Sequence, residues 1–277
     1  MGIRGDKNSH IQLPASVINE FSQPESFINS RGFKETHQYT YCLHRDLVIE
    51  KLRVDKEANT EKGYYENPIE EDLSIIETHF GRAKNKVLEL KDYLLYNKNI
   101  PKEKTIFSEL EILSIVKYCS ICWMRSPVFA KAVEEKSFAI KAGLIANEPQ
   151  NIVLMQYFND PDIVDRYFSD MNMTFIINNS NVDFILPQIG FVSPKTFDEN
   201  QFEVYIPIHP KAAIYLTHKE VIIDGSLVVY CVGEHDVDYI NKLSINNEFH
   251  NNVGNIYAEN EADILRYKEF YTPRTKK

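Results

Sequence analysis

The sequence lacks the features that mark membrane, secreted and nucleotide-binding proteins. No apolar run reaches the roughly 20 residues that cross a bilayer, and the longest, at about 112–123, is interrupted by Ser114, Lys117 and Ser120. The first ten residues hold no apolar stretch, so we expect no signal peptide. The sequence has no P-loop, no G-x-G-x-x-G, no H-E-x-x-H and no G-x-S-x-G. We therefore expect no membrane contact and no metal site, and no motif indicates a cofactor.

Cysteine is scarce, with Cys42, Cys119, Cys122 and Cys231 as its only occurrences. Cys119 and Cys122 form a C-x-x-C, but they lie in an apolar run with helical spacing, and no second pair accompanies them. Buried free thiols are the favoured interpretation, with redox or metal chemistry as the alternative. Free thiols fit a reducing compartment, so we expect a cytoplasmic protein.

Positive charge is in deficit. The 277 residues include 31 Lys and Arg against 40 Asp and Glu, which gives a formal net charge of −9. An acidic chain repels phosphate backbones, so broad nonspecific nucleic-acid binding is not expected, although a local basic groove stays open. Hydrophobic residues make up 43% and charged residues 26%, as in an ordinary globular protein with a sizeable core.

Helical and strand periodicities appear early in the chain. Leu13, Val17 and Phe21 are four residues apart and follow Pro14, which predicts a short helix with one buried face. Alternating apolar residues on both sides of an H-R-D turn predict a β-hairpin at about 37–54.

A helical block is expected at about 68–170. Pro68 begins a long helix, and a second helix covers about 107–124. Further helices are expected at about 127–141 and 150–170. The buried stripe of the long helix is predicted to be Leu73, Ile76, Phe80, Val87, Leu90 and Leu94.

Strands dominate from Met173 onward, with one or two helices near the end, in a β-rich part at about 173–258. Segregated helices and mostly antiparallel strands predict an α+β fold, and we expect a single domain over residues 1–277. The G-E-H-D-V-D run at 233–238 is expected in a polar loop before a helix. Helix-entry residues are the favoured interpretation, and a divalent-ion site is the alternative.

Three side chains are the first candidates for chemistry. His10 stands four residues before the proline-started helix, and it either belongs to an active site or only docks that helix. Glu77 lies at the edge of the long helix's stripe, where it makes an interhelical contact or faces a cleft. Arg125 follows an apolar helix. It is either a cation that the helix dipole stabilises at the helix C-terminus or a guanidinium that binds an anion.

The order of several motifs resembles a bacterial family known only as a domain of unknown function, family 4238. The run "HIQLPASVINEF" resembles its N-terminal HYVP-like motif, and "GYYENPIEEDLSIIE", "RSPVF", "YIPIHPKAAIYL" and "VDYINKL" follow in the family's order, over about residues 8–260. The resemblance implies a bacterial cytoplasmic α+β protein. It also implies that five side chains converge, namely His10, Tyr65, Glu77, Arg125 and Asn241.

One departure from the family pattern bears on activity. Where the family has an S-D-N-P motif, this chain reads "LPQIG", with Gln188 at the acidic position. If the acidic residue serves catalysis, this chain is either inactive or uses another group. If it caps a turn, Gln188 and Gly190 could do the same.

Two functions follow as hypotheses. The first is a phosphodiester hydrolase, a nuclease-like effector of phage defence or a toxin. His10 would be the general acid or base, Glu77 would orient it or bind a metal, and Arg125 would stabilise charge on phosphate, with Tyr65 and Asn241 binding substrate. The second is a non-catalytic protein-interaction or regulatory module, in which these polar residues form an internal network. The partner would be nucleic acid in the first case and a protein in the second.

Overall fold

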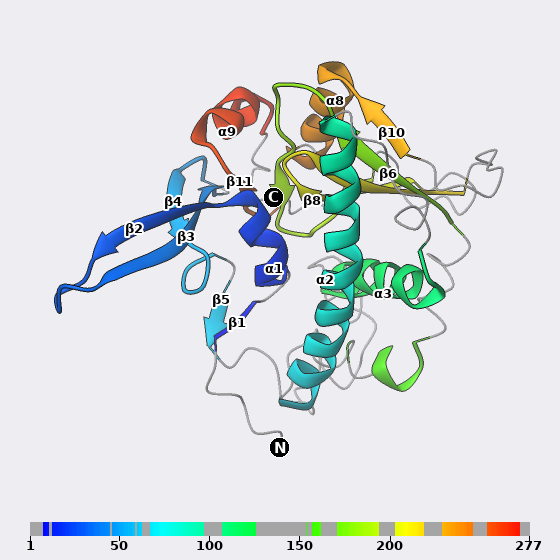
Figure 1. Ribbon diagram of the computed structural model, residues 1–277, viewed down its shortest axis with the longest axis horizontal. Helices are drawn as coiled ribbons and strands as arrows, with labels where there is room; N and C mark the ends of the chain where they lie inside the picture. The colour runs from blue at the N-terminus through cyan, green and yellow to red at the C-terminus, as the bar shows by residue number, and fades with distance from the viewer. Residues whose placement is uncertain are drawn as a thin grey trace, which may run out of the picture.

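The structure is a computed structural model that describes part of the chain. The described residues are 8–10, 13–44, 46–58, 60–62, 67–96, 107–125, 154, 157–161, 171–193, 203–218, 229–245 and 254–271. They form an α+β fold in which antiparallel sheets pack against a long central helix (Figure 1). The predicted fold class is confirmed.

The elements are as follows. The helices and helical turns are α1 (Ala15–Ile18), η1 (Asn19–Phe21), α2 (Asn67–Leu95), α3 (Glu109–Met124), α8 (Glu234–Ile245), α9 (Glu261–Tyr267) and η3 (Lys268–Phe270). The strands are β1 (Asn8–His10), β2 (Gln23–Ile28), β3 (Lys34–Leu43), β4 (Ile49–Arg53), β5 (Thr60–Lys62), β6 (Asn172–Asn178), β7 (Leu186–Pro187), β8 (Glu203–His209), β9 (Ala212–Thr217), β10 (Val229–Val232) and β11 (Ile256–Ala258).

The sheets join the two ends of the sequence. One sheet has the order β2–β3–β11–β7, with β4 also paired to β3, and in it Tyr41 of β3 lies opposite Ala258 of β11. A second sheet has the order β10–β6–β9–β8, in which β10 runs parallel to β6 while the other pairs are antiparallel. Strands β1 and β5 form a separate antiparallel pair. The predicted hairpin at 37–54 is confirmed as β3 and β4, but it forms one sheet with strands from the β-rich end.

Helix α2 carries the buried stripe that its sequence predicts. Leu73, Phe80, Val87 and Leu90 are at most 2% exposed, whereas Ile76 and Leu94 are only partly buried. Burying one large aliphatic or aromatic side chain contributes about 1.5–3 kcal/mol, so this stripe fixes the helix against the core.

Helix α3 packs against α2 and begins at a capping box. The Ser108 hydroxyl accepts from the Glu111 N–H at 3.3 Å, and the Glu111 carboxylate accepts from the Ser108 N–H at 2.7 Å. The rings of Phe80 and Tyr118 stack between the two helices with centroids 3.7 Å apart. The start of α3 is therefore set locally, and the contact with α2 helps to set its position.

The short N-terminal helix packs as predicted. Leu13, Val17 and Phe21 are all fully buried. A Cβ at Gly190 would lie 2.8 Å from Leu13 Cδ2 and 3.0 Å from Cys122 Sγ, and Gly190 has φ +85°. The turn at Gly190 thus brings the start of α1 and helix α3 into close contact, which only glycine permits.

A protruding β-ribbon is the main element that the sequence did not predict. Strand β2 pairs antiparallel with β3 from Gln23 opposite Tyr39 to Ile28 opposite Lys34, and this ribbon, residues 23–39, extends away from the body (Figure 1). We call it the arm. Every residue of β2 is exposed, so no buried face gives it the alternating pattern by which strands are recognised.

Other expectations are corrected or lie outside the described residues. Helix α8 begins at Glu234, so the G-E-H-D-V-D run forms its first turn and is not a loop before it. There Arg266 contacts Glu234 and Asp238, and Tyr267 donates to Asp238. The helix expected at 127–141 lies outside the described residues, as does most of the stretch 150–170.

Candidate functional site

Glu77 and Arg125 form an ion pair between α2 and α3. Arg125 is the C-cap residue of α3, and its backbone N–H donates to the Ile121 carbonyl at 2.8 Å. Its side chain is only 2% exposed, and Nη1 donates to Glu77 Oε1 at 3.0 Å. The Glu77 side chain is 27% exposed. Of the two sequence interpretations of Glu77, an interhelical contact is the one found.

Burial shifts the pKa of ionisable groups on both helices. Burial raises the pKa of the Glu77 carboxyl, and the Glu70 charge adds to this effect, although the Arg125 charge and hydrogen bond oppose it. Burial also raises the pKa of the Cys122 thiol to about 12, so this thiol stays protonated. Both cysteines of the C-x-x-C are buried and form no disulfide, as the favoured interpretation predicted.

Asn241 is engaged by backbone at another place in the fold. It is fully buried on α8. Its side-chain oxygen accepts from the Ile185 N–H at 3.0 Å, and its side-chain nitrogen donates to the Asp183 carbonyl at 2.7 Å. Both ends of the amide are thus used to hold the segment between β6 and β7, which is the structural work expected of a buried polar side chain.

Two predicted site residues are not placed with the pair. The backbone of His10 is in β1, opposite Thr60 of β5, and its side chain is outside what the structure describes. Tyr65 lies outside the described residues. Of the five positions, the structure therefore brings together Glu77 and Arg125.

Gln188 holds the turn in which the resembled family has its acidic motif. Its side-chain oxygen accepts from the Asn255 N–H at 2.7 Å, and its own N–H donates to the Asn255 carbonyl at 2.8 Å. The Gly190 N–H closes the turn on the Pro187 carbonyl at 2.8 Å. Gln188 and Gly190 together therefore do the turn-forming work that the sequence allowed for them.

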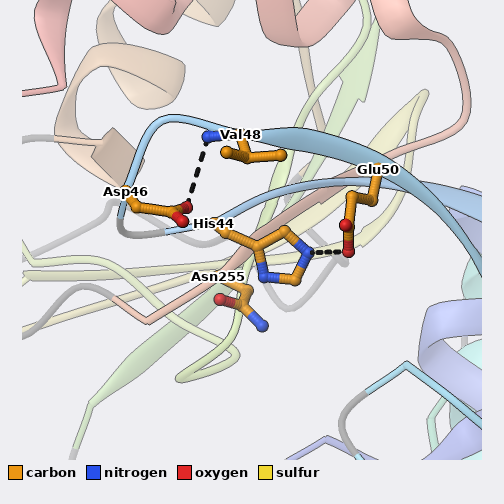
Figure 2. Close-up of a pocket in the computed structure, with 5 residues that line it drawn as sticks. All are labelled: His44, Asp46, Val48, Glu50 and Asn255. Carbon is orange, nitrogen blue, oxygen red and sulfur yellow. Dashed lines mark hydrogen bonds and ion pairs between the residues drawn. The ribbon is translucent and has the colours of Figure 1, made fainter.

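A shallow, open pocket of about 450 Å³ lies beside the β3–β4 turn. It is lined by His44, Asp46, Val48, Glu50 and Asn255, as Figure 2 shows. His44 Nε2 lies 3.0 Å from Glu50 Oε2, and Asp46 Oδ1 accepts from the Val48 N–H at 3.3 Å.

This pocket is acidic and contains none of the predicted site residues. Two carboxylates beside an imidazole suit a cationic group better than a phosphate, which they would repel. The sequence predicted the hairpin but not this pocket. The signal that could have located it is the hairpin turn, because it brings His44 back toward Glu50. Among the described residues, no group of three His, Cys, Asp or Glu side chains is placed to hold a metal ion.

No helix in the described part of the chain has both the length and the apolar character needed to cross a membrane. Comparisons with protein-family models, with curated proteins and with solved structures gave no match.

Proposed function

We propose that this chain is a non-catalytic interaction protein that contacts a protein partner through the tip of its arm. One observation carries the proposal: large apolar side chains stand in solvent at the end of a projecting ribbon. Phe27 is 41% exposed, Ile28 75% and Phe33 68%. Single exposed apolar residues are ordinary, but a group of them on a projection is typical of an interaction site.

The tip, residues 27–34, has a defined shape. The Asn29 N–H donates to the Phe33 carbonyl at 2.9 Å, and the Asn29 side chain accepts from the N–H groups of Arg31 and Phe33 at 2.9 and 3.0 Å. Gly32 supplies the left-handed residue of the turn, with φ +80°. A partner would therefore meet a preformed surface with little ordering cost.

The charge of the tip indicates the partner's chemistry. It holds Arg31 and Lys34, although the whole chain carries −9, and the neighbouring Glu35 carboxylate accepts from the Asn29 side chain at 2.5 Å. Aromatic, aliphatic and Arg side chains together are the usual centre of a protein interface. We propose a partner protein with an apolar groove edged by Asp and Glu, and a cytoplasmic setting consistent with the four free thiols.

The hydrolase hypothesis rests on the Glu77–Arg125 pair alone. A carboxyl with a raised pKa beside a guanidinium is a known acid and anion-binding combination. Its setting supports a structural role better, because Arg125 is sealed and each partner neutralises the other. The variant Glu77→Gln separates the hydrolase from the interaction protein. A hydrolase would lose cleavage of RNA or DNA, whereas an interaction protein would still bind its partner.

The experiment is site-specific photocrosslinking in the cells that produce the chain. A photoreactive amino acid replaces Phe33 in one strain and Tyr230, an exposed aromatic residue on β10, in a matched control. We expect one discrete protein adduct from position 33 and none from position 230. Adducts of equal kind and yield at both positions, or an adduct to nucleic acid, would overturn the proposal.

A further inference from the structure

The turn between β8 and β9 brings a histidine against a lysine of the central helix. His209 is the last residue of β8, and Lys91 lies near the C-terminal end of α2. Lys91 Nζ is 3.4 Å from His209 Nε2. The side chain of Lys91 is only 12% exposed, so this contact is held within the fold and is not a chance meeting of two mobile surface groups.

The other ring nitrogen fixes which atom of His209 carries the proton. The backbone N–H of Lys211 donates to His209 Nδ1 at 2.9 Å, so Nδ1 is an acceptor. A neutral imidazole then has its hydrogen on Nε2. Nε2–H and the Lys91 ammonium are both donors, so neither can accept a hydrogen bond from the other.

The surrounding charges favour an anionic acceptor. Besides burial, three positive charges lower the pKa of His209, those of Lys91, Lys84 and Lys211. The charge of Asp92 acts in the opposite direction. Lys84 is committed to Glu20 and to the Ser16 carbonyl, and Lys211 to Asp183 and the Ser180 carbonyl. Lys91 contacts Asp92 at 3.1 Å, but an ammonium has three hydrogens to donate.

We propose that Lys91 and His209 bind one oxyanion group, a phosphate or a carboxylate, whose oxygen accepts from Nζ and from Nε2–H together. Charge-assisted hydrogen bonds of this kind are short and strong, and a partly buried site intensifies them. The bound anion would tie α2 to the β8–β9 turn. The site is independent of the arm, so it stands or falls apart from the proposed function.

The test is long-range ¹H–¹⁵N NMR of the histidine rings during titration with inorganic phosphate, at constant ionic strength set with chloride. We expect the free protein to show His209 with its hydrogen on Nε2. We expect phosphate to shift its ring signals in a saturable way and to raise its pKa from about 4. A parallel titration with acetate distinguishes a carboxylate from a phosphate ligand.

Lys91→Met should abolish saturation. The matched control is Lys86→Met on the same helix, whose ammonium is already paired with Glu111 at 2.9 Å, and it should bind as wild type does. A hydrogen on Nδ1, a linear response to both anions, or unchanged saturation in Lys91→Met would each overturn the proposal. Raised thermal stability with phosphate in wild type and in Lys86→Met confirms that both are folded and bind.

Discussion

Arg125 Nη1 lies 3.0 Å from Glu77 Oε1, which joins the end of α3 to the N-terminal half of α2. Arg125 is 2% exposed, so water does little to stabilise its charge. The contact with Glu77 and its other neighbours must do so instead. Removing one partner of a buried pair leaves the other charge uncompensated, which costs more than replacing both partners by apolar groups of similar volume. This relationship gives a stability prediction that an exposed catalytic pair would not.

Arg125→Met should destabilise the protein by about 2–4 kcal/mol, because the partly buried Glu77 is left with its charge unpaired. Glu77→Gln should cost less, about 1–2 kcal/mol, because the Arg125 guanidinium loses its countercharge but keeps the amide oxygen as an acceptor. Urea unfolding of the two variants measures both values. Equal losses from the two would contradict the assignment of burial as the dominant effect on Glu77.

The same carboxyl predicts a pH dependence. The pKa of Glu77 is raised by burial above its ordinary value of 4.5, so the folded state holds this proton more tightly than the unfolded state. Its contribution to stability therefore falls as pH rises above 4.5. The unfolding free energy of wild type minus that of Glu77→Gln should decrease over that range. A difference that grows with pH would show that Arg125 outweighs burial.

His209 should act in the opposite direction. Burial and the charges of Lys91, Lys84 and Lys211 lower its pKa to about 4 from 6.5. The folded state therefore binds this proton less tightly, and stability that is present above pH 6.5 is lost as pH falls toward 4, by about 1–3 kcal/mol. His209→Gln should flatten that part of the curve, whereas His235→Gln, at a 98% exposed side chain, should leave it unchanged.

The α+β class, the hairpin and the stripe of α2 could be predicted because each buries one face in a regular period. The arm could not be predicted, because Phe27 and Ile28 are adjacent in sequence and both are exposed. Their strand therefore lacks the alternation of apolar and polar residues by which strands are recognised. The sequence singled out Glu77 and Arg125 as separate candidates, but it did not predict that they contact each other. The distance between them depends on how α3 packs on α2, which the Phe80–Tyr118 stack helps to set. Asn241 was expected at a shared site, but its amide spans two backbone groups that lie far from it in sequence.

Gly190→Ala should cost at least about 2 kcal/mol, from the left-handed φ and from the contacts at 2.8 and 3.0 Å that the new Cβ would make. Gly32→Ala tests the φ effect alone, because it has φ +80° and nothing lies within 4 Å of the added Cβ. It should cost about 1–2 kcal/mol. Chemical denaturation of the two variants separates the cost of the left-handed φ from the cost of the close contacts. Equal losses of stability would show that the added Cβ at position 190 does not meet Leu13 and Cys122.

The thiols should differ sharply in reactivity. Cys42, Cys119 and Cys122 are buried, and burial raises the pKa of Cys42 and of Cys122 to about 12 each, while Cys231 is exposed. One thiol per chain should react quickly with a disulfide reagent at pH 8, and all four after unfolding. Cys231→Ser should remove the fast phase. A fast reaction of Cys119 or Cys122 would revive the redox interpretation of the C-x-x-C.

The most direct measurement of the proposed function is the affinity of the purified chain for the protein crosslinked at position 33. The double variant Phe27→Ser, Phe33→Ser should bind at least about 10-fold more weakly. Each aromatic side chain that becomes buried against the partner contributes more than about 1 kcal/mol to binding. Glu77→Gln and Tyr230→Ser should bind as wild type does. Unchanged affinity in the arm variant, together with a loss of binding or of nucleic-acid cleavage in Glu77→Gln, would contradict the proposed function and return the activity to the Glu77–Arg125 pair.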